Sequence, residues 1–351
     1  MSRHFRSTVS EPEGRGREFG ARHAAEIRRT VELYAGLFER AAGRVVDPRP
    51  FGALALGRVA TFAPALHAEM LGIAAGAGID PERIGAINAR TEILAVLNAP
   101  ARGECSTVVQ IDPYSSAPVA VQTWDWYAEF SPQWLVWEMP RAEGGCVTTV
   151  TEFGIVGKAG VTSRGLGLLF NILHHARDGD GIGVPVHVLA RAVLDGSGDI
   201  NAALQLINRT QVSASSCMTL VAGADGASSA VAVEVHPGGP GLEFPDAHGL
   251  LVHTNHFLTA PACEHDTEPA QFPDTLIRHD LLVRRLRGRT LTSASAIAAM
   301  NSHLGTVGAV CCHPDPTLPA TGQHATLATI VLDVGAGTLT AHPGGPCRHA
   351  T

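Results

Sequence analysis

Residues 98–111, Asn98-Ala-Pro-Ala-Arg-Gly-Glu-Cys-Ser-Thr-Val-Val-Gln-Ile111, mark the point at which the pattern of the sequence changes. Before this stretch, apolar residues recur at the three- and four-residue spacing that is typical of amphipathic helices. After it, short β-branched and aromatic runs separated by turn residues predict strands. The sequence therefore predicts a helical N-terminal prefix followed by a part that is rich in sheet.

The periodicity places the individual elements. In the prefix we expect helices over residues 17–42, 64–75 and 81–97, after a loose polar tail at residues 1–17. The later helices are expected in pairs, at 186–194 with 200–208 and at 273–287 with 293–304. Few βαβ alternations occur, which favours an α+β fold with antiparallel sheets between helical layers. The expected strands are residues 107–111, 119–126, 135–138, 147–153, 154–161, 166–171, 218–222, 230–236, 250–255, 327–333 and 338–342.

Composition narrows the class of protein. The chain has 351 residues, of which 45% are hydrophobic and 17% charged, so it can bury a large core. A net charge of −7 without a run of basic residues argues against a nucleic-acid partner. We see neither the apolar stretch of about 18 residues that a membrane span needs nor a signal peptide, and we expect a cytoplasmic protein with no membrane partner. Seven cysteines fit reduced thiols better than a disulfide framework.

Several common catalytic motifs are absent, among them a Walker-A loop, HExxH, paired CxxC and GxSxG. His253 and His256 have a spacing that resembles that of metal ligands. On a strand end, however, the two imidazoles would point in different directions. We therefore expect no metal and no cofactor. The run Cys311-Cys312-His313 fits a reactive thiol beside a base or a buried thiol pair beside a surface histidine. Cys105, by its position alone, fits a small buried core residue.

The surroundings of Cys105 point to a known family. Gly103-Glu-Cys-Ser-Thr107, followed by Gln122-Thr-Trp-Asp-Trp126, resembles the penicillin acyltransferase-like (acyl-coenzyme A:6-aminopenicillanic acid acyltransferase) family of N-terminal nucleophile (Ntn) hydrolases. The resemblance extends over about residues 20 to 350. Shorter matching pieces follow in the expected order: Asn88–Ile93, Gly167–Asn171, Val212–Ser216, Glu234–Pro237, His253–His256 and Gly344–Cys347.

The resemblance implies a four-layer αββα sandwich and a chain that cuts itself between Glu104 and Cys105. Residues 1–104 would form a helical propeptide, and residues 105–351 the catalytic chain of the same Ntn domain, with the two fragments staying associated. Glu104 departs from the penicillin acyltransferase branch, in which glycine precedes the nucleophile, and this bears on cleavage efficiency. That branch also has a C-terminal arginine, which the resemblance places around residues 310–313, where this sequence has none.

The resemblance also implies roles for individual residues. Cys105 would be the nucleophile, and its freed α-amine the base, since an α-amine titrates near 7.7 to 8 and a thiol near 8.5. Asp125 would hold the new ammonium group, and Asn255 would stabilise the oxyanion. The substrate cleft would be shaped by Asn171, Trp124 and Trp126.

The implied function is an amidohydrolase or acyltransferase that acts through a Cys105 thioester on a small amide or acyl-thioester, with acyl-coenzyme A as one such donor. Two alternatives stay open at this point. The first is a conventional cysteine hydrolase that uses a histidine such as His253 or His256. The second is an Ntn-fold protein that serves binding or assembly without catalysis or cleavage.

Overall fold

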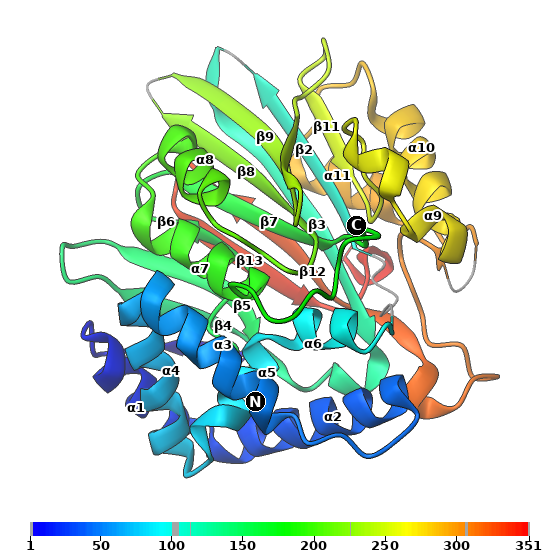
Figure 1. Ribbon diagram of the computed structural model, residues 1–351. Helices are drawn as coiled ribbons and strands as arrows, with labels where there is room; N and C mark the ends of the chain where they lie inside the picture. Colours follow the sequence, from blue (N-terminus) through cyan, green and yellow to red (C-terminus); the bar gives the residue numbers. More distant parts are fainter. Residues whose placement is uncertain (1–2, 100–104, 113, 225, 306–307, 350–351) are drawn as a thin grey trace.

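Two β-sheets packed face to face form the centre of the molecule, as the computed structural model shows (Figure 1). The structure describes residues 3–99, 105–112, 114–224, 226–305 and 308–349. Strands β2 and β3 of the smaller sheet lie against β7, β8 and β9 of the larger one. Because each sheet buries one face on the other, the core lies mainly between them and under the helices that cover their outer faces.

The larger sheet has the strand order β1-β4-β5-β6-β7-β8-β9-β10. Its neighbouring strands are antiparallel except for β1 and β4, which are parallel. The strands are β1 (His4–Arg6), β4 (Trp134–Pro140), β5 (Cys146–Glu152), β6 (Ala159–Thr162), β7 (Leu166–Ile172), β8 (Ser216–Ala224), β9 (Ala227–His236) and β10 (Gly239–Glu243).

The smaller sheet is antiparallel throughout, with the order β11-β2-β3-β12-β13. Its strands are β11 (Leu250–His253), β2 (Ser106–Asp112), β3 (Ser115–Tyr127), β12 (His324–Asp333) and β13 (Thr338–Pro343). In the register of β2 and β3, Ser106 lies opposite Thr123. This register brings the start of β2 next to the end of β3 that carries Asp125.

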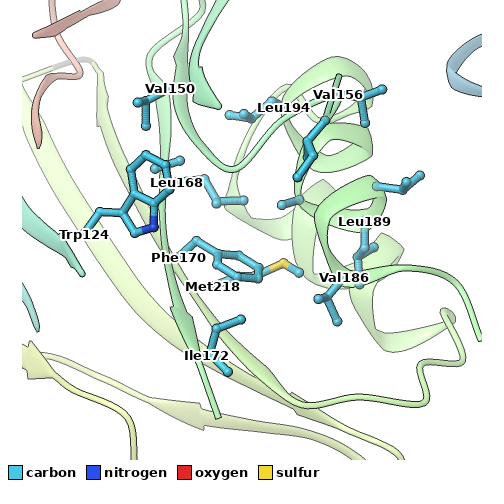
Figure 2. Close-up of a cluster of buried hydrophobic side chains, with 14 of the residues drawn as sticks. Trp124, Val150, Val156, Leu168, Phe170, Ile172, Val186, Leu189, Leu194 and Met218 are labelled. Carbon is cyan, nitrogen blue, oxygen red and sulfur yellow. The ribbon is translucent and has the colours of Figure 1, made fainter. Parts of the chain in front are cut away.

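Helices complete the outer layers. The larger sheet is covered by α7 (Val186–Gly196) and α8 (Ile200–Asn208), and the smaller sheet by α10 (Asp274–Leu286) and α11 (Ser293–Met300). Figure 2 shows how Leu168, Phe170 and Met218 of the larger sheet meet side chains of α7. The predicted α+β fold with two sheets between helical layers is confirmed.

The prefix helices gather at one end of the sheets, at the bottom of Figure 1. Phe19 stacks on Trp137 of β4 with ring centroids 4.1 Å apart, which seats the prefix on the larger sheet. No helix in the described ranges is both long and apolar enough to cross a membrane. The prefix helices are α1 (Pro12–Arg22), α2 (Ala24–Ala42), α3 (Arg49–Phe62), α4 (Pro64–Ala77), α5 (Pro81–Asn88) and α6 (Arg90–Val96).

The expectation of a loose tail at residues 1–17 is wrong, because this segment forms β1 and most of α1. Helix α1 looks polar in the sequence but packs tightly on α4 through glycines. A Cβ on Gly16 would lie 2.1 Å from the backbone oxygen of Glu69, so only glycine allows this approach. The helix is therefore held by backbone proximity rather than by an apolar stripe.

Other boundaries also differ from the expectation. The helix expected over 17–42 is interrupted at His23, and the one expected over 81–97 at Ala89. The strand expected from residue 154 begins only at Ala159, since Gly154 turns the chain with a φ of 93°. Helix α3, strand β10 and the short helix α9 (Glu268–Gln271) were not predicted.

Candidate active site

Cys105 lies directly before β2, and its side chain is buried. Its Sγ is 3.8 Å from the backbone oxygen of Asp125 on the neighbouring strand β3. The Asp125 side chain is itself almost fully buried. Glu104, on the other side of the expected cut, lies outside the described residues. The structure thus brings together the predicted nucleophile and the predicted carboxylate.

The carbonyl oxygen of Cys105 accepts hydrogen bonds from two buried side chains of other layers. Nδ2 of Asn171, on β7, donates at 3.1 Å, and Nη1 of Arg278, on α10, also donates at 3.1 Å. The larger sheet, the smaller sheet and the outer helix α10 therefore meet at residue 105. Three elements fix the position of its backbone.

Arg278 extends this network to Asn255, which follows β11. Nη2 of Arg278 donates to Oδ1 of Asn255 at 3.1 Å, while Nδ2 of Asn255 donates to the carbonyl of Ile172 at 2.9 Å. A side-chain amide nitrogen carries two hydrogens, and Ile172 accepts one of them. Because the amide oxygen of Asn255 accepts from Arg278, the side-chain amide has one orientation, in which its nitrogen donates to Ile172.

Asn171 is fixed in the same way. Its Oδ1 accepts hydrogen bonds from Thr107 Oγ1 at 2.7 Å and from Gln122 Nε2 at 3.1 Å. Both partners belong to the smaller sheet. These contacts leave the Asn171 nitrogen as the donor toward Cys105, so the amide has one defined orientation.

A cluster of buried charges lies beside this network. Lys158 Nζ is 3.3 Å from Glu152 Oε2 and 3.8 Å from the ring centroid of Trp124. Arg90, from the prefix, has its Nη2 3.4 Å from the same oxygen, and its guanidinium lies 4.4 Å from the ring centroid of Trp126. Cations of this kind, held over aromatic rings and paired with a carboxylate, keep positive charge in a dry environment.

The charges act on the thiol in opposite directions. Burial, and then the charge of Asp125, raise the pKa of Cys105 to about 11, while Lys158 and Arg278 lower it. Burial also lowers the pKa of Lys158 to about 7, against the opposing effect of Glu152. In this structure the thiol is therefore mostly protonated at neutral pH, and a base must take its proton before it can attack.

A cavity of about 200 Å³ opens next to these residues. Its walls include Trp126 and Ile172, which are the chain neighbours of Asp125 and Asn171. Leu94 and Leu173 add apolar surface, and Arg90 adds a cation. Trp124 is not among the residues that line this cavity, since it packs on Lys158 and Trp134. Of the three predicted substrate residues, only Trp126 is among the residues that line this cavity. Asn171 is the chain neighbour of Ile172, which lines it.

The histidines of the alternative mechanism have other partners. His253 Nε2 lies 2.8 Å from Glu234 Oε1, and His256 Nδ1 lies 3.0 Å from Thr275 Oγ1. The ring nitrogens of the two side chains thus engage separate partners. These contacts do not pair either imidazole with the Cys105 thiol.

Sequence reasoning missed two residues of this site. Arg278 contacts Cys105 from α10, a helix on which Arg284 is exposed and Arg285 donates to the carbonyl of Ala299 on α11. No local motif marks Arg278. Lys158 did leave a signal, because it is the only lysine in a chain that otherwise uses arginine.

Comparisons with known proteins agree with the resemblance. The sequence model of the family described as "Acyl-coenzyme A:6-aminopenicillanic acid acyl-transferase" matches residues 115–345. The "Acyl-coenzyme A:6-aminopenicillanic-acid-acyltransferase 40 kDa form" of Emericella nidulans is 28% identical over 228 residues, or 64% of this chain. The chain spans only 60% of the length of that relative.

Two solved structures are also similar. The Caenorhabditis elegans ortholog of N-acylethanolamine-hydrolyzing acid amidase is 13% identical with a TM-score of 0.45, and the match covers 68% of this chain and all of that one. Penicillin V acylase from Agrobacterium tumefaciens is 15% identical with a TM-score of 0.45, over 68% of this chain and 83% of that one.

Proposed function

Because the chain belongs to the acyl-coenzyme A:6-aminopenicillanic acid acyl-transferase family, we propose that it is a self-processing amidohydrolase or acyltransferase whose nucleophile is Cys105. The observation that carries the proposal is that Asn171 and Arg278 both donate to the carbonyl of the residue that follows the expected cut, while Arg278 also orients Asn255. Buried polar side chains cost stability unless they are satisfied, and here they satisfy one another around the reacting residue.

Self-cleavage begins with the Cys105 thiol. Sγ attacks the carbonyl carbon of Glu104, the C–N bond to Cys105 breaks, and the amide becomes a thioester with a free α-amine. Water then hydrolyses the thioester, which gives the Glu104 carboxylate and restores the thiol. The step needs no co-reactant beyond water. The products are residues 1–104 and 105–351.

The two fragments stay together because the prefix is part of the core. Glu92 of α6 accepts a hydrogen bond at 2.8 Å from the backbone nitrogen of Val186 on α7, and it is fully buried. Tyr34 and Arg90 both contact Glu152 of β5. Removing the prefix would expose these charges and the apolar faces around them, so the cut chain remains one folded unit.

In turnover the freed α-amine of Cys105 takes the thiol proton, which the raised pKa of the buried thiol makes necessary. Sγ attacks the acyl carbon of an amide or thioester, and the second N–H of Asn255 donates to the oxyanion that develops. Asp125 holds the ammonium group of Cys105. Asn171 and Arg278 position the residue through its carbonyl oxygen.

The acyl group binds in the cavity lined by Trp126, Ile172 and Leu94. Its volume of about 200 Å³ and mixed apolar lining suit a small acyl chain. The named relative uses an acyl-coenzyme A donor, and a small amide or acyl-thioester is the class of substrate that we assign here. The acyl acceptor is water or an amine.

Trapping the acyl-enzyme tests this function. The purified full-length protein is mixed with an acyl-coenzyme A thioester or an N-acyl p-nitroanilide, quenched within a turnover, digested and analysed by mass spectrometry. We expect the acyl mass on the peptide that contains Cys105. Cys105→Ala should show neither adduct nor turnover, while Cys263→Ser, which changes an exposed thiol, should behave as the native protein does. An adduct on another cysteine, or turnover by Cys105→Ala, would refute the assignment.

A further inference from the structure

Four ligating side chains converge at a place that the proposed reaction does not use. They are His303, Cys311, His313 and Cys347, and their donor atoms all lie within 4.8 Å of one another. His303 follows α11, Cys311 and His313 precede β12, and Cys347 lies in the 3-10 helix Pro346–Arg348. Three segments that are separate in the sequence therefore supply one cluster.

The distances fit coordination of a single ion. His303 Nε2 lies 3.1 Å from His313 Nε2, and His313 Nε2 lies 3.6 Å from Cys311 Sγ and 3.5 Å from Cys347 Sγ. Zinc binds sulfur at about 2.3 Å and imidazole nitrogen at about 2.0–2.1 Å, so the edges of a tetrahedron around it measure about 3.3–3.8 Å. These three separations from His313 Nε2 lie in or close to that range.

Backbone hydrogen bonds hold the segments of the cluster in place without an ion. The nitrogen of Cys311 donates to the carbonyl of Ser302 at 3.0 Å, which holds the segments of His303 and Cys311 together. The nitrogen of Gly344 donates to Leu327 of β12 at 3.0 Å, which holds the segment of Cys347. A Cβ on Gly345 would lie 2.6 Å from Cys311 Sγ, so glycine at this position leaves room for the sulfur.

We propose that His303, Cys311, His313 and Cys347 form a structural zinc site. Two thiolates and two neutral imidazoles fill all four tetrahedral positions, and a closed set of this kind is typical of structural rather than catalytic zinc. The donor types, two sulfurs and two imidazole nitrogens, favour zinc over magnesium or calcium. On binding, each of the two thiols releases one proton to solvent, and no electron is transferred.

The segment that carries Cys311 and His313 is hydrogen-bonded to β12, the strand next to the one that carries Asp125. Thr326 of β12 lies opposite Asp125 in the sheet, and its backbone nitrogen donates to the carbonyl of Cys312 at 3.0 Å. The zinc would therefore tie the C-terminal segment to the part of the smaller sheet that borders the active site. Its expected contribution is to hold the start of β12, not to take part in the reaction.

Metal content tests the proposal directly. The full-length protein is produced with zinc in the medium, gel-filtered and analysed by inductively coupled plasma mass spectrometry, and we expect about one zinc per chain. His303→Ala removes a ligand that is exposed, so the variant should fold, and it should lose most of the zinc. Cys347→Ser should do the same. Cys263→Ser and His248→Ala, which change exposed side chains outside the cluster, should keep it.

Cobalt gives a second readout that does not depend on activity. Protein loaded with Co²⁺ in place of zinc should show the visible absorption of a tetrahedral ion with thiolate ligands, and Cys347→Ser should weaken the sulfur-to-cobalt band. Protein without stoichiometric metal, or with a Cys311–Cys347 disulfide in peptide mapping, would overturn the proposal. Zinc that the His303→Ala and Cys347→Ser variants both retain would overturn it as well.

Discussion

Arg278 Nη1 lies 3.1 Å from the carbonyl oxygen of Cys105, although 173 positions separate the two residues in the sequence. The same guanidinium contacts Ser106 Oγ at 3.2 Å and Asn255 Oδ1 at 3.1 Å. A planar fork can reach three acceptors at once, which the single ammonium of lysine cannot do in the same geometry. Arg278 therefore couples the position of the nucleophile to that of the expected oxyanion donor.

Replacing the guanidinium of Arg278 with the ammonium of lysine keeps the positive charge but should slow the reaction. Arg278→Lys should lower kcat by about 10²-fold, because small displacements of reacting groups cost rates of that order. Arg284→Lys is the matched control, since Arg284 lies on the same helix but is 77% exposed at its side chain. Steady-state kinetics on both variants, with circular dichroism to check folding, decide the matter. Native kcat in Arg278→Lys would show that the contact is dispensable.

Asn255→Ala should lower kcat by about 10²- to 10³-fold with little change in KM, because a donor to the oxyanion acts mainly in the transition state. Asn208→Ala, at the exposed end of α8, serves as the control and should leave both constants unchanged. The split between kcat and KM is the informative quantity. A variant that changes KM alone would assign Asn255 to substrate binding instead.

The charge of Lys158 should set the pH range of activity. Lys158 lowers the pKa of the Cys105 thiol through its positive charge. The same charge acts on the α-amine of Cys105, which must be neutral to take the thiol proton, so Lys158→Met should raise the pKa of the α-amine and move the acid limb of the kcat/KM profile to higher pH. Lys158→Arg keeps a cation beside Trp124 and should leave the limb closer to its native position. Coincident profiles for Lys158→Met and the native protein would exclude this electrostatic role.

Glu92 should make stability depend on pH. Burial raises the pKa of this carboxyl to about 7 from its ordinary value of 4.5, so between these pH values the folded state binds more protons than the unfolded state. The free energy of unfolding should therefore fall as pH rises from 4.5 to 7 and stay low above it. Glu92→Gln keeps an acceptor for Val186 and should remove that loss, on the order of 3 kcal/mol.

Urea unfolding at pH 5 and pH 8 measures the effect of Glu92. The stabilisation by Glu92→Gln should be large at pH 8 and small at pH 5. Glu39→Gln, which changes an exposed carboxylate on α2, should alter stability little at either pH. An equal effect of Glu92→Gln at both pH values would mean that ionisation of Glu92 is not its source.

The sequence predicted the features that depend on local pattern. The change at residues 98–111, most strands of the two sheets and the helix pairs follow from periodicity and turn residues, which report nearby conformation. The sequence also pointed to Cys105 and Asp125, and the structure brings them together because β2 and β3 are neighbours. Strands β2 and β3 follow one another in the sequence and pair in the sheet, so two residues about twenty positions apart come close together.

The features that it missed depend on long-range packing. Arg278 resembles any other arginine of its helix until the fold places it beside Cys105. Helix α1 lacks an apolar stripe because its glycines pack on α4 by backbone approach. The cluster of His303, Cys311, His313 and Cys347 comes from separate segments, and the spacing of these residues in the sequence does not indicate that they lie close together. Only the tertiary structure shows these contacts.

The intact mass of the purified protein tests the central claim most directly. We expect two polypeptides, residues 1–104 and residues 105–351, that elute together under native conditions, with a free α-amine on Cys105 in the second. The Cys105→Ala variant should remain one chain of 351 residues. A native protein that stays uncut after prolonged incubation, yet transfers or hydrolyses acyl groups at full rate, would contradict the account.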